Sequence, residues 1–92
     1  MSKRRSRLEI SLIILSAIRD GVDKPTRIMY AANMSWASSQ KILSSLVEQG
    51  FIEVKMPLKI GKSKKRYVIT KKGKKVVVYL EKANELLPIN AL

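Results

Sequence analysis

Lysine and arginine are the residues of this sequence with the clearest chemistry. The chain has 19 Lys and Arg residues against 7 Asp and Glu residues, a formal net charge of +12 over 92 residues. No acidic residue interrupts the stretch between Pro57 and Lys75. The cations that open this stretch are Lys59, Lys62, Lys64, Lys65 and Arg66. Crowded cations favour a polyanionic partner, with nucleic acid ahead of an anionic membrane surface.

Residue types that enzymes use for acid–base or nucleophilic chemistry are scarce. The sequence contains neither histidine nor cysteine, so the usual zinc ligand and the thiolate nucleophile are both missing. Its 7 carboxylates are scattered singly, without a close pair suited to metal binding or acid–base catalysis. We therefore expect no enzyme activity, no metal and no small-molecule cofactor.

The N-terminal region carries a basic start followed by an apolar run over residues 10–18, which imitates a secretory signal. Two acidic residues, Asp20 and Asp23, follow that run, and no small-residue cleavage pattern is present. No apolar stretch reaches the roughly 18 residues of a membrane span. We expect an intracellular protein, cytoplasmic and nucleoid-associated, that has no membrane partner.

The cationic side chains need elements to position them, and helical periodicity predicts three helices in the first half of the chain. The first covers residues 8–19 and ends near Gly21. A shorter second helix covers 26–32, and a tight turn at Asn33–Met34 separates it from a third over 36–49. Ser35 is a good N-cap for the third helix and Gly50 ends it. Two helices joined by such a turn indicate a helix-turn-helix.

The third helix is the predicted DNA-reading element. Leu43, Leu46 and Val47 face inward, whereas small and polar residues face out. Gln40 presents a donor and an acceptor to a base edge, and Lys41 reaches a phosphate or a guanine. The predicted DNA-contacting residues of this region are Ser35, Trp36, Ser38, Ser39, Gln40 and Lys41. An ordinary solvated helix face would satisfy the same pattern.

The alternation after Gly50 predicts a hairpin, with strands over 52–56 and 66–69 around the basic loop. We interpret this loop as a wing that lies along the DNA backbone or the minor groove. The predicted contacts are Lys62, Lys64, Lys65 and Arg66. A merely solubilising loop is the alternative.

Three aromatic residues are ambiguous. Trp36 either stacks on a sugar or base or packs under the turn before the third helix, and packing is favoured at such positions. Tyr30 and Tyr67 each bury a ring or offer a hydroxyl to a phosphate.

A last helix is predicted from Lys71 to about Leu87, with Thr70 as its cap. Spacings of four, three and four residues give a coiled-coil seam of Val76, Leu80, Ala83 and Leu87. This seam predicts a homodimer interface. Packing within one chain against the first helix is the alternative.

The segments TRIMYAANMSWASSQKILSSLVEQGFIE and RYVITKKGKKVV resemble the small archaeal winged-helix DNA-binding proteins. Within this group, the sequence resembles the dimeric chromatin-associated type, whose C-terminal helix forms an antiparallel coiled coil. The resemblance implies DNA contacts from residues 35–41 and 62–66, and a phosphate near Arg27. Pro88 departs from the pattern because it stands where a longer coiled coil would continue.

These observations predict an α+β fold, mostly α: a winged helix-turn-helix with a three-helix core, a two-stranded wing and a C-terminal dimerisation helix. Residues 1–7 form a basic arm, 8–70 the DNA-binding domain and 71–92 the dimerisation element. The expected function is binding of double-stranded DNA, in transcription regulation or nucleoid organisation. The alternative is a protein-interaction subunit of a transcription or replication assembly; few exposed aromatic residues argue against RNA.

Overall fold

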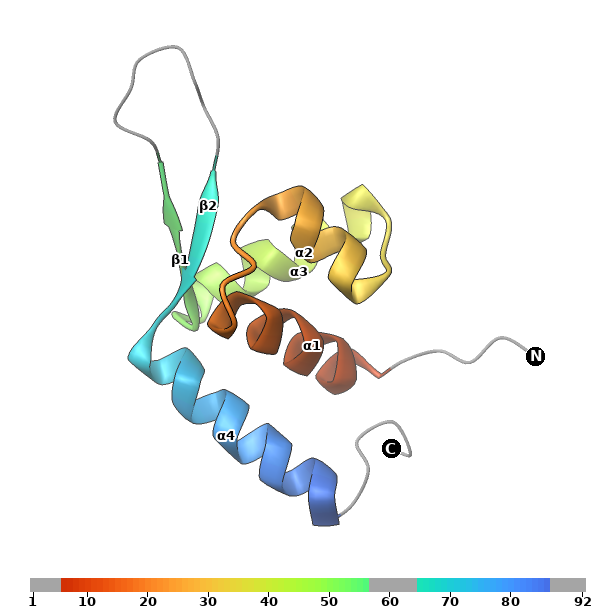
Figure 1. Ribbon diagram of the computed structural model, residues 1–92, viewed down its shortest axis with the longest axis vertical. Helices are drawn as coiled ribbons and strands as arrows, with labels where there is room; N and C mark the ends of the chain where they lie inside the picture. Colours follow the sequence, from red (N-terminus) through yellow and green to blue (C-terminus); the bar gives the residue numbers. More distant parts are fainter. Residues whose placement is uncertain (1–5, 57–64, 87–92) are drawn as a thin grey trace, which may run out of the picture.

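The computed structural model describes residues 6–56 and 65–86. In this part of the chain, four helices and one antiparallel hairpin follow the predicted order (Figure 1). The elements are α1 (Arg7–Arg19), α2 (Pro25–Ala32), α3 (Trp36–Glu48), β1 (Ile52–Lys55), β2 (Arg66–Ile69) and α4 (Lys71–Leu86). The predicted fold class, mostly α with a two-stranded hairpin, is confirmed.

Left-handed residues end α1, α2 and α3. Gly21, Asn33 and Gly50 have φ angles of 102°, 53° and 81°. At the end of α3, the Gly50 N–H donates to the Val47 carbonyl and the Phe51 N–H donates to the Leu46 carbonyl, both at 3.0 Å. These paired bonds satisfy carbonyls that a helix end leaves unpaired. The predicted stops at all three residues are confirmed.

The element boundaries differ from the predicted ones by a residue. Ser6 caps α1 by accepting from the Glu9 N–H at 3.0 Å, so the helix begins at Arg7. β1 ends at Lys55 and α3 ends at Glu48, each one residue early. In α2, Ile28 and Ala32 are buried, whereas Ala31 is exposed.

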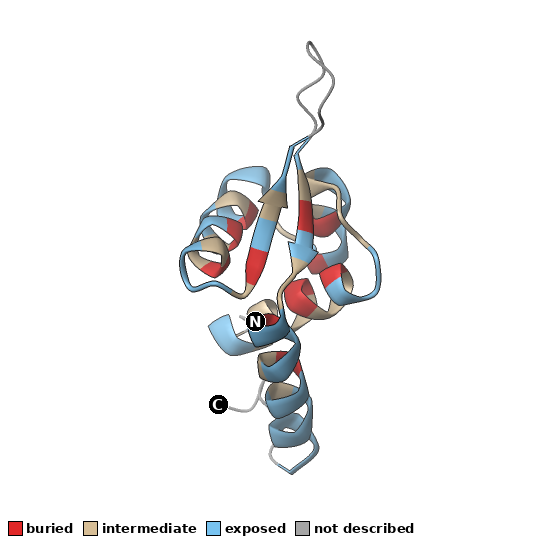
Figure 2. Ribbon diagram, turned by 90° about the vertical axis from the view of Figure 1, so that its left-hand side faces the viewer, coloured by how far each residue is buried: buried red, intermediate tan, exposed pale blue. Residues whose placement is uncertain are grey.

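Each of these elements contributes buried residues to one core, and Figure 2 marks the buried positions in red. Its fully buried large apolar members are Ile14, Leu15, Ile28, Leu43, Ile52 and Val77. Tyr67 from β2 joins them and is only 5% exposed, and this burial raises the pKa of its phenol above the ordinary value. Tyr67 is therefore a core residue, which resolves its ambiguity.

The start of α4 is attached to the end of α3. Thr70 Oγ1 accepts from the Gly73 N–H at 3.0 Å, as predicted for an N-cap, and donates to the Gly50 carbonyl at 2.7 Å. Lys72 Nζ donates to the Gln49 carbonyl at 2.8 Å. A Cβ added at Gly73 would collide with the carbonyl oxygen of Phe51. Close backbone approach therefore requires glycine at this position.

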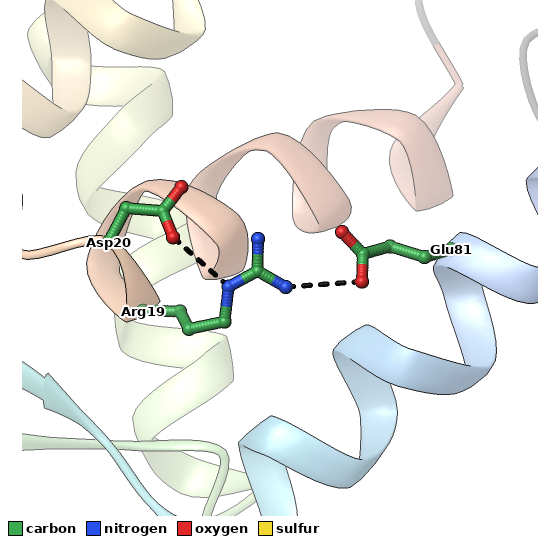
Figure 3. A network of polar contacts seen from close by, with 3 residues as sticks. All are labelled: Arg19, Asp20 and Glu81. Carbon is green, nitrogen blue, oxygen red and sulfur yellow. Dashed lines mark hydrogen bonds and ion pairs between the residues drawn. The ribbon is translucent and has the colours of Figure 1, made fainter.

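The body of α4 packs against α1. Val77 is fully buried in the shared core. Arg19 at the end of α1 donates to both Asp20 and Glu81, each at 3.1 Å, and so bridges the two helices (Figure 3). The hydrogen bond to Asp20, followed by that to Glu81, raises the pKa of Arg19 further above its ordinary value. Packing of α4 within one chain is thus confirmed for this side of the helix.

Within the described ranges, none of the helices has the length and apolar character needed to cross a membrane.

Candidate nucleic-acid interface

The turn between α2 and α3 fixes the start of α3. Asn33 adopts the left-handed conformation, and the Met34 N–H donates to the Met29 carbonyl at 3.1 Å. Ser35 then accepts from the Ser38 N–H through its Oγ at 3.2 Å. Asn tolerates left-handed dihedrals better than most residues, and serine is among the best N-caps. The predicted helix-turn-helix geometry is therefore confirmed.

One side of α3 is uncovered and carries short side chains. Leu43 and Leu46 turn the opposite side into the core. The exposed α3 face is defined by Ala37, Ser38, Lys41 and Ser44. Small side chains let a helix approach a groove closely, and Lys41 adds one cation in their midst. Because Lys41 forms no ion pair with any described residue, its charge is available to a ligand.

The assignment of Ser39 to the DNA-contacting set is wrong. Its side chain is fully buried, and its hydroxyl donates to the Trp36 carbonyl at 2.8 Å. The spacing to Leu43 and Leu46 puts Ser39 on the core side of α3. A buried serine is tolerated there because its hydroxyl finds a partner one turn back.

Gln40 and Trp36 lie at the edge of the exposed α3 face. Gln40 is half-buried, and its covered Nε2 makes no hydrogen bond within residues 6–56 and 65–86. Trp36 is 50% exposed at the first position of the helix. Trp36 is therefore not a core residue, and half of its surface is open to solvent.

Two residues of α2, the first helix of the helix-turn-helix, are exposed. Arg27 lies in the first turn of α2 and Tyr30 one turn later, 76% exposed. Each residue extends its side chain into solvent, where it is open to a phosphate. Tyr30 is therefore exposed whereas Tyr67 is buried, a difference that the sequence pattern does not predict.

The base of the hairpin is fixed to the connector between α1 and α2. Arg66 donates through Nη1 to the Asp23 carboxylate at 3.1 Å, and the Tyr67 N–H donates to the Asp23 carbonyl at 2.9 Å. Asp23 was not among the predicted site residues, since no local pattern links positions 43 apart. Arg66 is accordingly committed in part to an ion pair, whereas its neighbour Lys65 is exposed and unpaired within the described residues.

Some predicted positions lie outside the described residues: Lys62 and Lys64 of the wing, Leu87 of the seam, and the basic start of the chain. Of the other seam residues, Val76 and Leu80 are half-buried and Ala83 is exposed. They lie beside the side of α4 that contacts α1. No group of three metal-ligating residues occurs in the described ranges.

Comparisons with known proteins agree with this architecture. A family described as winged helix-turn-helix matches residues 4–87. The uncharacterized protein MJ0287 of Methanocaldococcus jannaschii is 34% identical over 84 residues, which are 91% of this chain and 78% of that protein. The resemblance to small archaeal winged-helix proteins is confirmed.

Solved structures show the same fold. Sso10a-2, a DNA-binding protein from Sulfolobus solfataricus, is similar with a TM-score of 0.75 and 28% identity, over 89% of this chain and 81% of that one. Lactococcus lactis ZitR, a zinc-responsive MarR family member, is similar with a TM-score of 0.72 and 21% identity. The match covers 92% of this chain and 58% of ZitR, and it extends to the fold alone.

Proposed function

The chain belongs to the winged helix-turn-helix family, and on this premise we propose that it binds double-stranded DNA. Its role is that of a transcriptional regulator or a nucleoid-organising protein in the cytoplasm. The description of the similar Sso10a-2 as a DNA-binding protein supports this assignment. We propose neither a catalytic activity nor a cofactor for this protein.

The exposed α3 face is the observation that carries the proposal. It combines short side chains with one unpaired cation, at the start of a helix whose N-terminal N–H groups favour negative charge. We assign α3 to the major groove, with Ser38 and Lys41 nearest the bases. Arg27 and Lys65 are assigned to the phosphate backbone, because both are exposed and unpaired among the described residues.

A homodimer through α4 is the second part of the proposal. Val76, Leu80 and Ala83 continue as an apolar line beside the α1 contact, so a partner helix would extend the existing core. Two DNA-binding faces in one dimer raise avidity.

The test of DNA binding is a fluorescence-anisotropy titration of duplex DNA, random and from a sequence library, across a salt series. We expect the slope of log affinity against log salt to fall in magnitude by about one for Lys65→Gln, which removes a phosphate contact. Lys55→Gln, on the exposed side of β1, is the matched control with unchanged binding to the library-selected sequence. A strong sequence preference at high salt indicates a regulator, and weak preference a nucleoid organiser.

The absence of binding at low salt would refute the proposal and favour the protein-interaction alternative. The dimer is tested separately by sedimentation equilibrium. Leu80→Gln should raise the dimer Kd by at least about tenfold, because each protomer loses buried apolar area. Val78→Gln, on the opposite side of α4, should leave the mass unchanged.

A further inference from the structure

The outer side of α4 is a charged surface that the proposed interface does not use. Its residues are all exposed and all lie on the side of the helix away from α1. The outward α4 face is defined by Lys71, Lys74, Lys75, Val78, Tyr79 and Lys82. It contains four cations, and one exposed acid, Glu85, follows one turn after Lys82.

The orientation of this face is fixed by contacts on the other side of α4. Gly73 and Val77 are buried, and Glu81 is held by Arg19 (Figure 3). The Thr70 cap sets the start of the helix. Rotation of α4 would break the cap, the packing and the ion pair together, so the lysines cannot turn inward.

The charge of the outward α4 face is not neutralised by the protein. None of its four lysines forms an ion pair with a residue in the described ranges. Lys72, one position away, shows the contrast, because its ammonium donates to the Gln49 carbonyl and lies 5.1 Å from the centre of the Phe51 ring. The neighbouring acid Glu81 is already paired with Arg19. Four adjacent cations therefore repel one another until an anion arrives.

The shape of the face fits an extended polyanion better than a small ligand. Lys74, Lys75, Val78, Tyr79 and Lys82 line an open depression rather than an enclosed pocket. Tyr79 is 75% exposed and can donate its hydroxyl to a phosphate. The spacing from Lys71 to Lys82 is about 16 Å along the helix. A parallel duplex presents roughly ten phosphates over that length.

We infer that the outward α4 face binds the phosphate backbone of a second DNA segment while the α3 interface holds the first. This inference rests on the proposed function. Figure 1 shows α4 on one side of α1, and α2 and α3 on the other side. The two surfaces lie on different elements that are separated by α1, so we assign them to two different duplexes that one protomer joins.

The side chains indicate backbone contact without sequence reading. Lysine is a flexible point charge that lacks the bidentate geometry of arginine, which suits phosphates more than base edges. A second copy of the chain is a poor occupant, because two outward α4 faces would bring eight lysines together with only two acids, Glu85 of each copy. An acidic protein would also neutralise the lysines, but the proposed function includes no acidic protein partner.

The test is a capture assay in which bead-bound duplex, loaded with protein, retains a second fluorescent duplex. The variant is Lys75→Gln with Lys82→Gln, because glutamine keeps helix propensity. The control is Arg7→Gln with Lys55→Gln, which lowers the net charge equally at exposed sites elsewhere. We expect at least about fivefold less capture by the α4 variant and a salt slope smaller by about two. Capture by the control variant should change less than twofold. The affinity of the α4 variant for one short duplex should also change less than twofold.

Unchanged capture by the α4 variant would overturn the inference, since capture would then come from two α3 interfaces of a dimer. A changed mass in sedimentation would also overturn it and assign the face to self-association. Wild-type protein that binds one duplex but captures no second overturns this inference alone. Wild-type protein that binds no duplex overturns the proposed function as well. Polyglutamate binding that is lost only in the α4 variant would assign the face to an acidic protein.

Discussion

Helices α3 and α4 each begin at a capping hydroxyl and each turn one side to the core, yet their exposed sides differ. The exposed α3 face carries mostly short side chains and one cation, whereas the outward α4 face carries four lysines. Short side chains permit close approach to base edges, and long cations hold a phosphate backbone at a distance. One fold thus offers two surfaces for the same kind of polymer.

The caps differ as well. Ser35 accepts one hydrogen bond and leaves the start of α3 open to solvent. Thr70 accepts one and also donates to the Gly50 carbonyl, so the start of α4 is joined to the end of α3. A free helix start can bind an anion, and a tied one positions the helix that follows it.

The largest expected effect comes from a substitution at the contact between the start of α4 and the end of α3. Gly73→Ala should lower the free energy of unfolding by about 3 kcal/mol, because the added Cβ collides with the Phe51 carbonyl and forces the backbone apart. Urea denaturation measures the change. Lys74→Ala, exposed on the same turn, serves as the control and should stay within about 0.5 kcal/mol. If Gly73→Ala has the same free energy of unfolding as the wild type, the close backbone contact between Gly73 and Phe51 does not hold α4 in place.

Removing the two capping hydroxyls compares the helix starts directly. Thr70→Ala should lower the free energy of unfolding by about 2 kcal/mol, since both a cap and a bond to the α3 end are lost. Ser35→Ala loses only a cap and should lower it by about 1 kcal/mol. Thermal unfolding of the two variants side by side is the measurement. Equal losses would contradict the difference between the caps.

A carboxylate on the exposed α3 face separates binding from stability. Ser38→Glu should weaken duplex binding by about tenfold, or about 1.4 kcal/mol, because it repels phosphates at close range. The fold should be unaffected, since Ser38 is exposed and an acid in the first helical turn is favourable. Anisotropy titration and urea denaturation of the same sample test both statements. A loss of stability that parallels the loss of binding would count against α3 as the interface.

Alkaline pH should act on the core that both helices share. The buried Tyr67 phenol has a raised pKa in the folded protein, so the folded state keeps its proton after the unfolded chain has released it. Stability is therefore full below about pH 10 and declines as pH rises through the folded pKa. Tyr67→Phe should flatten the decline in unfolding free energy above pH 10. An unaltered decline would assign the alkaline loss to other groups.

The helix boundaries and the fold class followed from local chemistry. Ser35, Asn33, Gly50 and Thr70 act through hydrogen bonds and dihedral angles within a few residues, so their types predict where helices begin and end. Apolar residues alternate along the two strands and recur at helical spacing before and after them. This change of period predicted the hairpin between α3 and α4. The relation to winged-helix proteins was visible in the same segments.

The tertiary structure decided which side chains are available. Ser39 is buried although its type suggested the surface, because α3 docks through that side and the Trp36 carbonyl satisfies its hydroxyl. Arg66 is tied to Asp23 across 43 positions of sequence. The periodicity of α4 predicted an apolar seam, yet only the contact of α4 with α1 determined which lysines face outward. Local bonds specify elements, whereas exposure depends on how distant elements pack, and that packing is not encoded in any short segment.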